Sequence, residues 1–454
     1  MFRLMRKYNR IYGSRLKMTE KDYEQGRRTF IFEGMLSTSI ATLSAGAFLA
    51  GYVLYLGGSQ EFSSLLLNVP AYASIIQILT PIIYERLVSR KGIVAIFAPL
   101  HRVLLGMMAF IPLLFNDTTT RLTVLFILYL VSFLILHVTN PAAINWIMSL
   151  VPDNIRGRYF GRRDSYMFAA TAVISIIMGF VLDYFKKMNS GTGFLIMYGI
   201  VLCFAIINFY FLAKIKEPKV QIRYYKDAYT GRKVPAGANF KQIFIVPFLN
   251  VKFRKILLMA SLWTVSVMIA IAYFPIYQVS VLNLDYSYIT FCLLLQTIAM
   301  VVFARFWGAF ADKHSWLKTL RISMLLLSLC HVVWSLISKE LIFIIPFQYI
   351  FAGICWSGIN LSLLNLSFIY SPLKGKTVYL SVYNCMMGVI GLAATILGTI
   401  FVRVLDKTEL KILTIPFSSM QILFAVSGLL MVGVGIFIKV NMEQNELFKK
   451  VESD

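Results

Sequence analysis

The run LTVLFILYLVSFLILHV at residues 122–138 decides the fold, and no charged side chain follows it before Leu150. A helix of about 20 apolar residues crosses the roughly 30 Å hydrocarbon layer of a bilayer. Peptide groups inside that layer have no water to bind, so they must pair within their own segment. Residues 122–150 therefore predict a membrane-spanning helix.

Twelve segments of this kind are visible. They cover residues 29–57, 62–84, 92–115, 122–150, 164–185, 192–213, 254–281, 287–309, 318–337, 341–370, 378–402 and 412–439. The composition agrees, because 58% of the 454 residues are hydrophobic and only 14% are charged. A set of soluble domains would contain far more charge. The sequence predicts an all-α integral membrane protein.

The net charge is +23, and the charges lie in short runs between the apolar segments. This placement indicates that the basic residues face the anionic inner surface of a membrane and do not bind nucleic acid. With the N-terminus placed in the cytoplasm, 35 of the 44 basic residues fall on the inner side and 7 on the outer side. Basic residues concentrate on the cytoplasmic side of membrane proteins. Both termini are expected in the cytoplasm.

The longest polar stretch, 214–253, divides the chain into two halves. The predicted parts are a cytoplasmic N-terminal segment (1–28), a six-helix bundle (29–213), a cytoplasmic linker (214–253), a second six-helix bundle (254–439) and a cytoplasmic tail (440–454). The halves show a weak repeat: Asn145 and Asn365 each lie seven residues before a proline that precedes a basic loop. Two repeated six-helix halves are typical of secondary transporters.

Two cytoplasmic loops carry a recognisable motif. The second copy is Gly308-Ala-Phe-Ala-Asp312-Lys313, and the first copy runs from Pro81 through Glu85-Arg86 to Arg90-Lys91. With the twelve spans and the basic central loop, these motifs resemble the major facilitator superfamily, in particular its uncharacterised bacterial members. The resemblance implies the major facilitator fold, in which twelve helices form two pseudo-symmetric six-helix bundles. The family's antiporter motif, a glycine- and proline-rich run, is absent from 164–185.

The resemblance also implies a cytoplasmic gate, because the loop acids would lie near helix N-termini and be stabilised by the helix dipole. Glu85 would face the start of the eleventh span, and Asp312 the start of the fifth. The gate candidates are Glu85, Arg86, Arg90, Arg156, Arg158, Asp312, Lys313 and Lys376. The alternative is solvated loop charge that only sets the topology.

Ionisable residues also occur within the spans. Arg102 lies near the bilayer midplane, where an arginine costs at least about 2.5–3.5 kcal/mol. It could contact the substrate, or it could bond to carbonyl groups of the second or fourth span. Glu33 in the first span could couple proton flow to transport, or it could pair with Arg27 or Arg28 at the cytoplasmic rim. His137 is a second coupling candidate because imidazole titrates near neutral pH, and its alternative is a packing role.

In the family, the first, fourth, seventh and tenth spans line the transport path. Polar and aromatic residues of these spans, with Arg102, are the substrate-binding candidates: His137, Asn140, Asn145, Trp146, Tyr273, Gln278, Trp356, Asn360, Asn365 and Arg102. Polar side chains also join helices to one another in any membrane bundle, so packing is the competing interpretation. Arg102, Arg305 and the scarcity of acids inside the spans favour an anionic or amphipathic substrate.

The sequence therefore predicts a secondary active transporter that moves a small solute by alternating access, with proton coupling as one option. Enzyme signatures are missing, the five cysteines form no metal or disulfide pattern, and we expect no cofactor, no metal and no nucleic-acid partner. The expected location is a bacterial inner membrane, with the protein as a monomer. A lipid or lipid-linked flippase of the same fold and a non-transporting membrane sensor remain as alternatives.

The topology can be tested by cysteine labelling. In a background without the five native cysteines, Arg232→Cys and Asp117→Cys should react with impermeant reagents from opposite sides of the membrane, because the two positions belong to loops of opposite charge bias. Labelling of both from one side would contradict the twelve-span topology.

Overall fold

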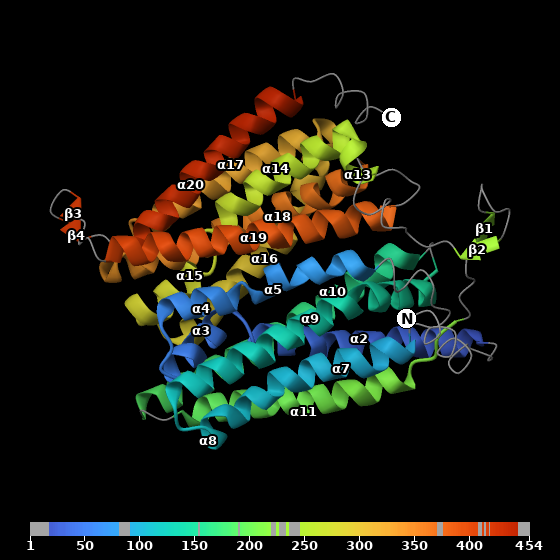
Figure 1. The fold of residues 1–454 in the computed structure, drawn as a ribbon, viewed down its shortest axis with the longest axis horizontal. Coiled ribbons are helices and arrows are strands. Elements are labelled where there is room, and N and C mark those ends of the chain that lie inside the picture. Colours follow the sequence, from blue (N-terminus) through green and yellow to red (C-terminus); the bar gives the residue numbers. More distant parts are fainter. Residues whose placement is uncertain are drawn as a thin grey trace. The chain divides into compact units, whose positions relative to one another are not determined.

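A computed structural model describes residues 18–80, 91–152, 155–188, 191–218, 224–226, 233–235, 246–369, 376–406, 411–412, 415–416 and 418–443. These residues are almost all helical (Figure 1). Among the described residues, eleven helices are long and apolar enough to cross a membrane, or twelve if α2 and α3, which meet at a bend of 46°, form one span. This confirms the predicted all-α membrane fold.

The chain divides into two compact units. The first combines residues 1–45 with 73–243, and the second combines 46–72 with 244–454. The predicted division of the sequence lay at the central linker alone. In the structure the segment 46–72, which holds the end of the first span and the start of the second, also belongs with the second unit.

The first unit is built around a row of long helices. Its elements are α2 (Glu20–Leu43), the 3-10 helix η1 (Ser74–Leu79), α7 (Lys91–Gly106), the 3-10 helix η2 (Met107–Phe110), α8 (Ile111–Leu114), α9 (Thr118–Leu150), α10 (Arg156–Lys187), α11 (Thr192–Lys214) and an antiparallel pair, β1 (Tyr224–Lys226) and β2 (Lys233–Pro235). Helix α7 packs against both α9 and α11, and α2 packs against α10 and α11. A Cβ on Gly106 would lie 2.7 Å from the Leu202 Cα atom, so glycine permits the close approach of α7 and α11.

The second unit contains the remaining elements. They are α3 (Gly46–Tyr55), α4 (Gln60–Leu67), α5 (Val69–Ala73, which ends at the unit boundary), α13 (Val246–Leu249), α14 (Val251–Met268), α15 (Tyr273–Ile276), the π-helix η4 (Tyr277–Val281), α16 (Tyr286–Lys313), α17 (Trp316–Trp334), the 3-10 helix η5 (Lys339–Ile344), α18 (Ile345–Ile369), α19 (Lys376–Asp406), the short pair β3 (Lys411–Ile412) and β4 (Ile415–Pro416), α20 (Ser419–Ile438) and the π-helix η6 (Lys439–Glu443). Helix α18 packs closely on α16 and α17, and α17 packs on α20.

Each unit has its own apolar core, and large apolar side chains also cover its outside. In the first unit Phe30, Trp146 and Leu212 belong to the core, whereas Phe180 on α10 is 63% exposed. In the second unit Met324 and Ile359 are fully buried, whereas Val302 on α16 is 62% exposed. Exposed apolar faces on long helices are expected when lipid replaces water as the solvent.

The ends of two helices show how local sequence sets the boundaries. Asp117 caps α9, because its carboxylate accepts hydrogen bonds from the backbone and side chain of Thr120, and these bonds lower the pKa of that carboxyl. The last span was predicted to begin at 412, which is wrong by seven residues: α20 begins at Ser419. Residues 411–412 and 415–416 pair as strands instead, and Ser418 and Gln421 form a capping box that starts the helix.

The contact between α16 and α18 gives a stability prediction. A Cβ on Gly353 would lie 2.3 Å from the carbonyl oxygen of Gln296, so Gly353→Ala should force the two helices apart at a cost of about 1–3 kcal/mol. Gly199→Ala is the matched control, because a Cβ at Gly199 meets no atom within 4 Å. The thermal unfolding midpoint of purified protein should fall for Gly353→Ala only. Equal midpoints for the two variants would contradict this packing.

Candidate functional site

A buried ion pair lies inside the first unit, between three helices. Nη2 of Arg102 on α7 lies 2.7 Å from Oε1 of Glu33 on α2 and donates to Oγ of Ser37 at 2.8 Å. Nη1 of Arg102 donates to Oδ1 of Asn208 on α11. Nδ2 of Asn208 in turn donates to the backbone carbonyl of Glu33 at 3.0 Å. Glu33 and Arg102 are 8% and 6% exposed, so the pair is almost completely withdrawn from solvent.

This cluster corrects both packing alternatives from the sequence. In one alternative Arg102 would bond to carbonyl groups of the second or fourth span, but its partners are side chains of the first and sixth spans. In one alternative Glu33 would pair with Arg27 or Arg28. Arg27 donates instead to the Leu150 carbonyl, and Arg28 pairs with Glu24. A buried charge needs an opposite charge with satisfied hydrogen bonds, and Asn208 completes them.

The other candidates on α9 have different surroundings. Nδ1 of His137 lies 2.8 Å from Nε2 of Gln77. Asn140 and Asn145 are exposed, and Asn145 donates to the carbonyl of Pro141 in its own helix. Trp146 is fully buried, with its ring edge against Phe30 at 5.4 Å. Trp146 therefore packs the core of the first unit in this structure, and its predicted substrate contact finds no support here.

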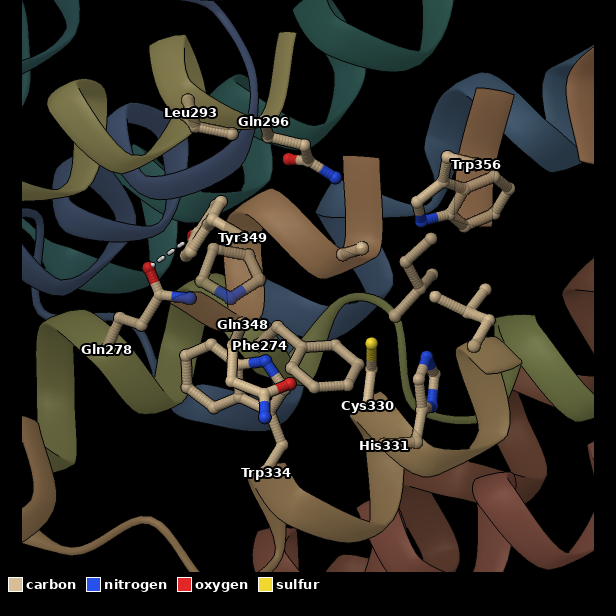
Figure 2. A pocket seen from close by; sticks show the side chains of 14 residues that line it. Phe274, Gln278, Leu293, Gln296, Cys330, His331, Trp334, Gln348, Tyr349 and Trp356 are labelled. Atoms are coloured by element: carbon tan, nitrogen blue, oxygen red, sulfur yellow. Dashed lines mark hydrogen bonds between the residues drawn. The ribbon is translucent and has the colours of Figure 1, made fainter. Parts of the chain in front are cut away.

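The second unit contains a pocket of about 250 Å³. Four stretches of chain contribute side chains to it (Figure 2). Its lining is Ile271, Phe274, Pro275, Gln278, Leu293, Gln296, Leu327, Cys330, His331, Trp334, Gln348, Tyr349, Ala352 and Trp356. Two of the predicted substrate-binding residues, Gln278 and Trp356, are brought together here.

The seventh span changes its helical geometry beside this pocket. Helix α14 ends at Met268, the chain turns over residues 269–272, and it continues as α15 and the π-helix η4. Pro275 has no amide hydrogen, so it cannot donate to the carbonyl of Ile271 as an unbroken helix would require. Ile271, Phe274 and Gln278 of this stretch line the pocket. Single-turn π-helices within α-helices occur frequently at functional sites.

Regular helix spacing supplies the other walls. On α18, Gln348, Ala352 and Trp356 follow at intervals of four residues and share one face. On α17, Leu327, Cys330, His331 and Trp334 form a similar stripe. Helix α16 adds Leu293 and Gln296, three residues apart, and both are labelled in Figure 2.

Three polar groups of the pocket have well-defined surroundings. The hydroxyl of Tyr349 donates to Oε1 of Gln278 at 2.9 Å, which is the dashed line in Figure 2. Nδ1 of His331 lies 2.9 Å from Oγ of Ser427, and that hydroxyl donates to the Ser266 carbonyl at 2.5 Å. Gln348 is 8% exposed, and among the described residues its Oε1 has no hydrogen-bond partner.

The sequence missed most of this site. The family resemblance points only to the first, fourth, seventh and tenth spans, so Gln296 in the eighth span and His331 and Trp334 in the ninth were not predicted. Gln348 lies in the tenth span, and its spacing of eight residues from Trp356 could have identified it. Of the remaining candidates, Tyr273 is fully buried, Asn360 is exposed with Nδ2 4.0 Å from Sδ of Met300, and Asn365 donates to the carbonyl of Leu361 in its own helix.

The predicted gate residues are only partly described. Glu85, Arg86 and Arg90 lie outside the described residues. Arg156 and Lys376 begin α10 and α19, but their side chains also lie outside the description. Arg158, Asp312 and Lys313 are exposed.

Comparison with known proteins agrees with this architecture. A sequence profile of the Major Facilitator Superfamily matches residues 31–396. No curated protein sequence gives a match. Among solved structures, a mutant of the nucleoside transporter NupG is 12% identical with a TM-score of 0.66, covering 92% of this chain and 100% of its own.

Two further structures are similar at the same level. An inward-facing bacterial homologue of the iron transporter ferroportin is 11% identical with a TM-score of 0.65, covering 96% of this chain and all of its own. The inward-open xylose transporter XylE from E. coli is 12% identical with a TM-score of 0.58. The match covers 96% of this chain and 98% of XylE. These likenesses show the fold. The fold is that of a multi-pass membrane transporter. The chain belongs to the Major Facilitator Superfamily, because the family profile spans most of its length.

The ion pair gives a prediction for stability. Glu33→Leu or Arg102→Leu alone leaves a buried charge without its partner and should cost about 3–5 kcal/mol of unfolding free energy. The double variant should be more stable than either single variant, because it buries no charge. Arg28→Ala, which removes the exposed pair with Glu24, is the control and should cost less than about 1 kcal/mol. Unfolding of the purified protein measures all four, and strictly additive losses would refute the pairing.

Proposed function

We propose that this protein is a secondary active transporter that moves a small solute across the plasma membrane by alternating access. The pocket of the second unit carries the proposal, because it joins aromatic walls to polar side chains, one of which, Gln348, has a buried oxygen without a hydrogen-bond partner among the described residues. Small-molecule sites are concave and mostly apolar, with a few polar groups that orient the ligand. The pocket also adjoins the π-helix of the seventh span, and such segments within α-helices are frequent at functional sites.

Glu33 is the proposed site of proton coupling. Its carboxylate balances the charge of Arg102 in a place with little solvent. A proton on Glu33 would remove that balance and leave Arg102 with neutral partners only, so protonation would favour a conformation in which Arg102 gains other contacts. Linkage of this kind couples proton binding to a conformational change. His137, which contacts Gln77, is the second candidate.

The ion pair changes the inference about substrate charge. The preference for an anionic substrate rested on Arg102 as an unbalanced charge inside the bundle. Its pairing with Glu33 removes that support, and Arg305 is exposed on α16. No observation specifically favours a flippase or a sensor over solute transport. The gate role of Asp312 and Glu85, the inner-membrane location and the cytoplasmic termini stay predictions.

Proteoliposome transport tests function and coupling together. A solute identified by thermal-shift screening should exchange across the membrane in counterflow and accumulate when a pH gradient is applied. Glu33→Gln, which keeps the shape of the side chain and one acceptor oxygen but cannot bind or release the proton, should abolish pH-driven accumulation and preserve counterflow, because exchange requires no net proton movement. His137→Ala serves as the comparison. Accumulation that survives in Glu33→Gln but disappears in His137→Ala would assign coupling to the histidine, and survival in both would exclude both residues.

A further inference from the structure

The pocket of the second unit is lined without any charge. Among its described lining residues there is no aspartate, glutamate, lysine or arginine, and its polar side chains are three amides, one imidazole, one phenol, two indoles and a thiol. An ion that left water for such a site would lose its hydration without gaining an opposite charge. The lining therefore favours a ligand without net charge.

The hydrogen-bonding directions of the pocket can be assigned in part. Because the Tyr349 hydroxyl donates to Oε1 of Gln278, Nε2 of Gln278 remains as a donor. The Ser427 hydroxyl gives its only hydrogen to the Ser266 carbonyl, so it must accept from Nδ1 of His331. In a neutral imidazole this leaves Nε2 as an acceptor.

Gln348 adds a second acceptor. Its Oε1 is buried and has no hydrogen-bond partner among the described residues. This oxygen is out of contact with the pocket space in the present side-chain position, and leaving a buried acceptor unsatisfied is costly. A turn of the Gln348 amide toward the pocket would therefore let a ligand donate to it. The pocket thus offers donors and acceptors side by side, and hydroxyl groups, which both donate and accept, match such a mixture.

Aromatic rings form the remaining walls. The rings of Phe274 and Trp334 meet edge to face at 5.5 Å, and Trp334 meets Tyr349 in the same way at 6.3 Å. On the other side Trp356 is held by Trp263 at 6.0 Å. These contacts fix the ring planes that a ligand would pack against. The pocket volume of about 250 Å³ is close to the lower end of the 300–1,000 Å³ of typical drug-sized sites, which suits a small ring compound.

We infer that this pocket binds an uncharged, hydroxyl-bearing ring compound. Free monosaccharides and nucleosides are the two classes of such compounds that the binding experiment distinguishes. Binding of this ligand does not depend on the proposed transport function. That the ligand is the transported solute rests on the proposed function. The amides and the imidazole bind the hydroxyl groups, and the aromatic walls cover the ring.

Binding to the purified full-length protein tests the ligand class. The probes are D-xylose, D-glucose and uridine, with glucose 6-phosphate and uridine monophosphate as their charged counterparts, measured by titration calorimetry. At least one neutral probe should bind with saturation, and its phosphorylated counterpart at least tenfold more weakly. Binding of a sugar identifies a monosaccharide site, and binding of uridine alone identifies a nucleoside site. No binding of any neutral probe at millimolar concentration, or tighter binding of a phosphorylated one, overturns the inference.

Substitutions then locate the site. Gln348→Leu should weaken binding of the neutral probe about tenfold, which is the loss expected for one hydrogen bond. Gln296→Leu is a second variant at a half-buried position, where folding should be less sensitive, and it should also weaken binding. Gln60→Leu is the matched control, because the amide of Gln60 donates to Ser280 outside the pocket. Unchanged binding in both pocket variants overturns the assignment.

Counterflow separates this inference from the proposed function. If a neutral probe binds in the pocket but does not exchange in proteoliposomes, the ligand assignment stands and the transport proposal fails. If an anionic solute exchanges at rates that Gln348→Leu and Gln296→Leu leave unchanged, transport stands and the ligand assignment fails.

Discussion

The constraint on which this structure depends is that a peptide group in lipid must find its hydrogen-bond partner within the protein. It makes each long apolar run form a helix. Because lipid is the solvent, apolar side chains also lie on the outside of the protein, as on α10 and α16. The same constraint makes each interruption costly. The turn at 269–272 and the π-helix that follows it are therefore features that the fold keeps at a cost, and the pocket lies beside them.

Burial imposes the same demand on side chains. Arg102 and Glu33 come from spans that are separate in sequence, and each would be unfavourable alone. Together with Asn208 and Ser37 they form a cluster that joins α2, α7 and α11. The described pocket residues of the second unit carry no charge, and their polar groups are neutral. The buried cluster of the first unit and the pocket of the second thus differ in chemistry: one holds compensated charge, and the other holds uncharged hydrogen-bonding groups.

The fold was largely predictable from the sequence, because hydropathy and span length report directly on the solvent. Where the prediction failed, local chemistry decided: the capping box of Ser418 starts α20 later than hydropathy alone suggests. The site was less predictable. Pairing of Glu33 with Arg102 depends on how helices far apart in sequence meet, and no spacing rule contains that information. His331 was not predicted because the family resemblance points to other spans, whereas residues of the eighth and ninth spans also line the pocket.

The uncharged lining of the pocket has an electrical consequence. Moving one elementary charge across a membrane changes its energy by about 2.3 kcal/mol per 100 mV, but a neutral solute held by amides and aromatic rings carries no such charge. Any current that accompanies uptake would then belong entirely to the coupling ion. Electrophysiological recording on this protein would accordingly count the coupling ions moved per solute, without a correction for the charge of the cargo.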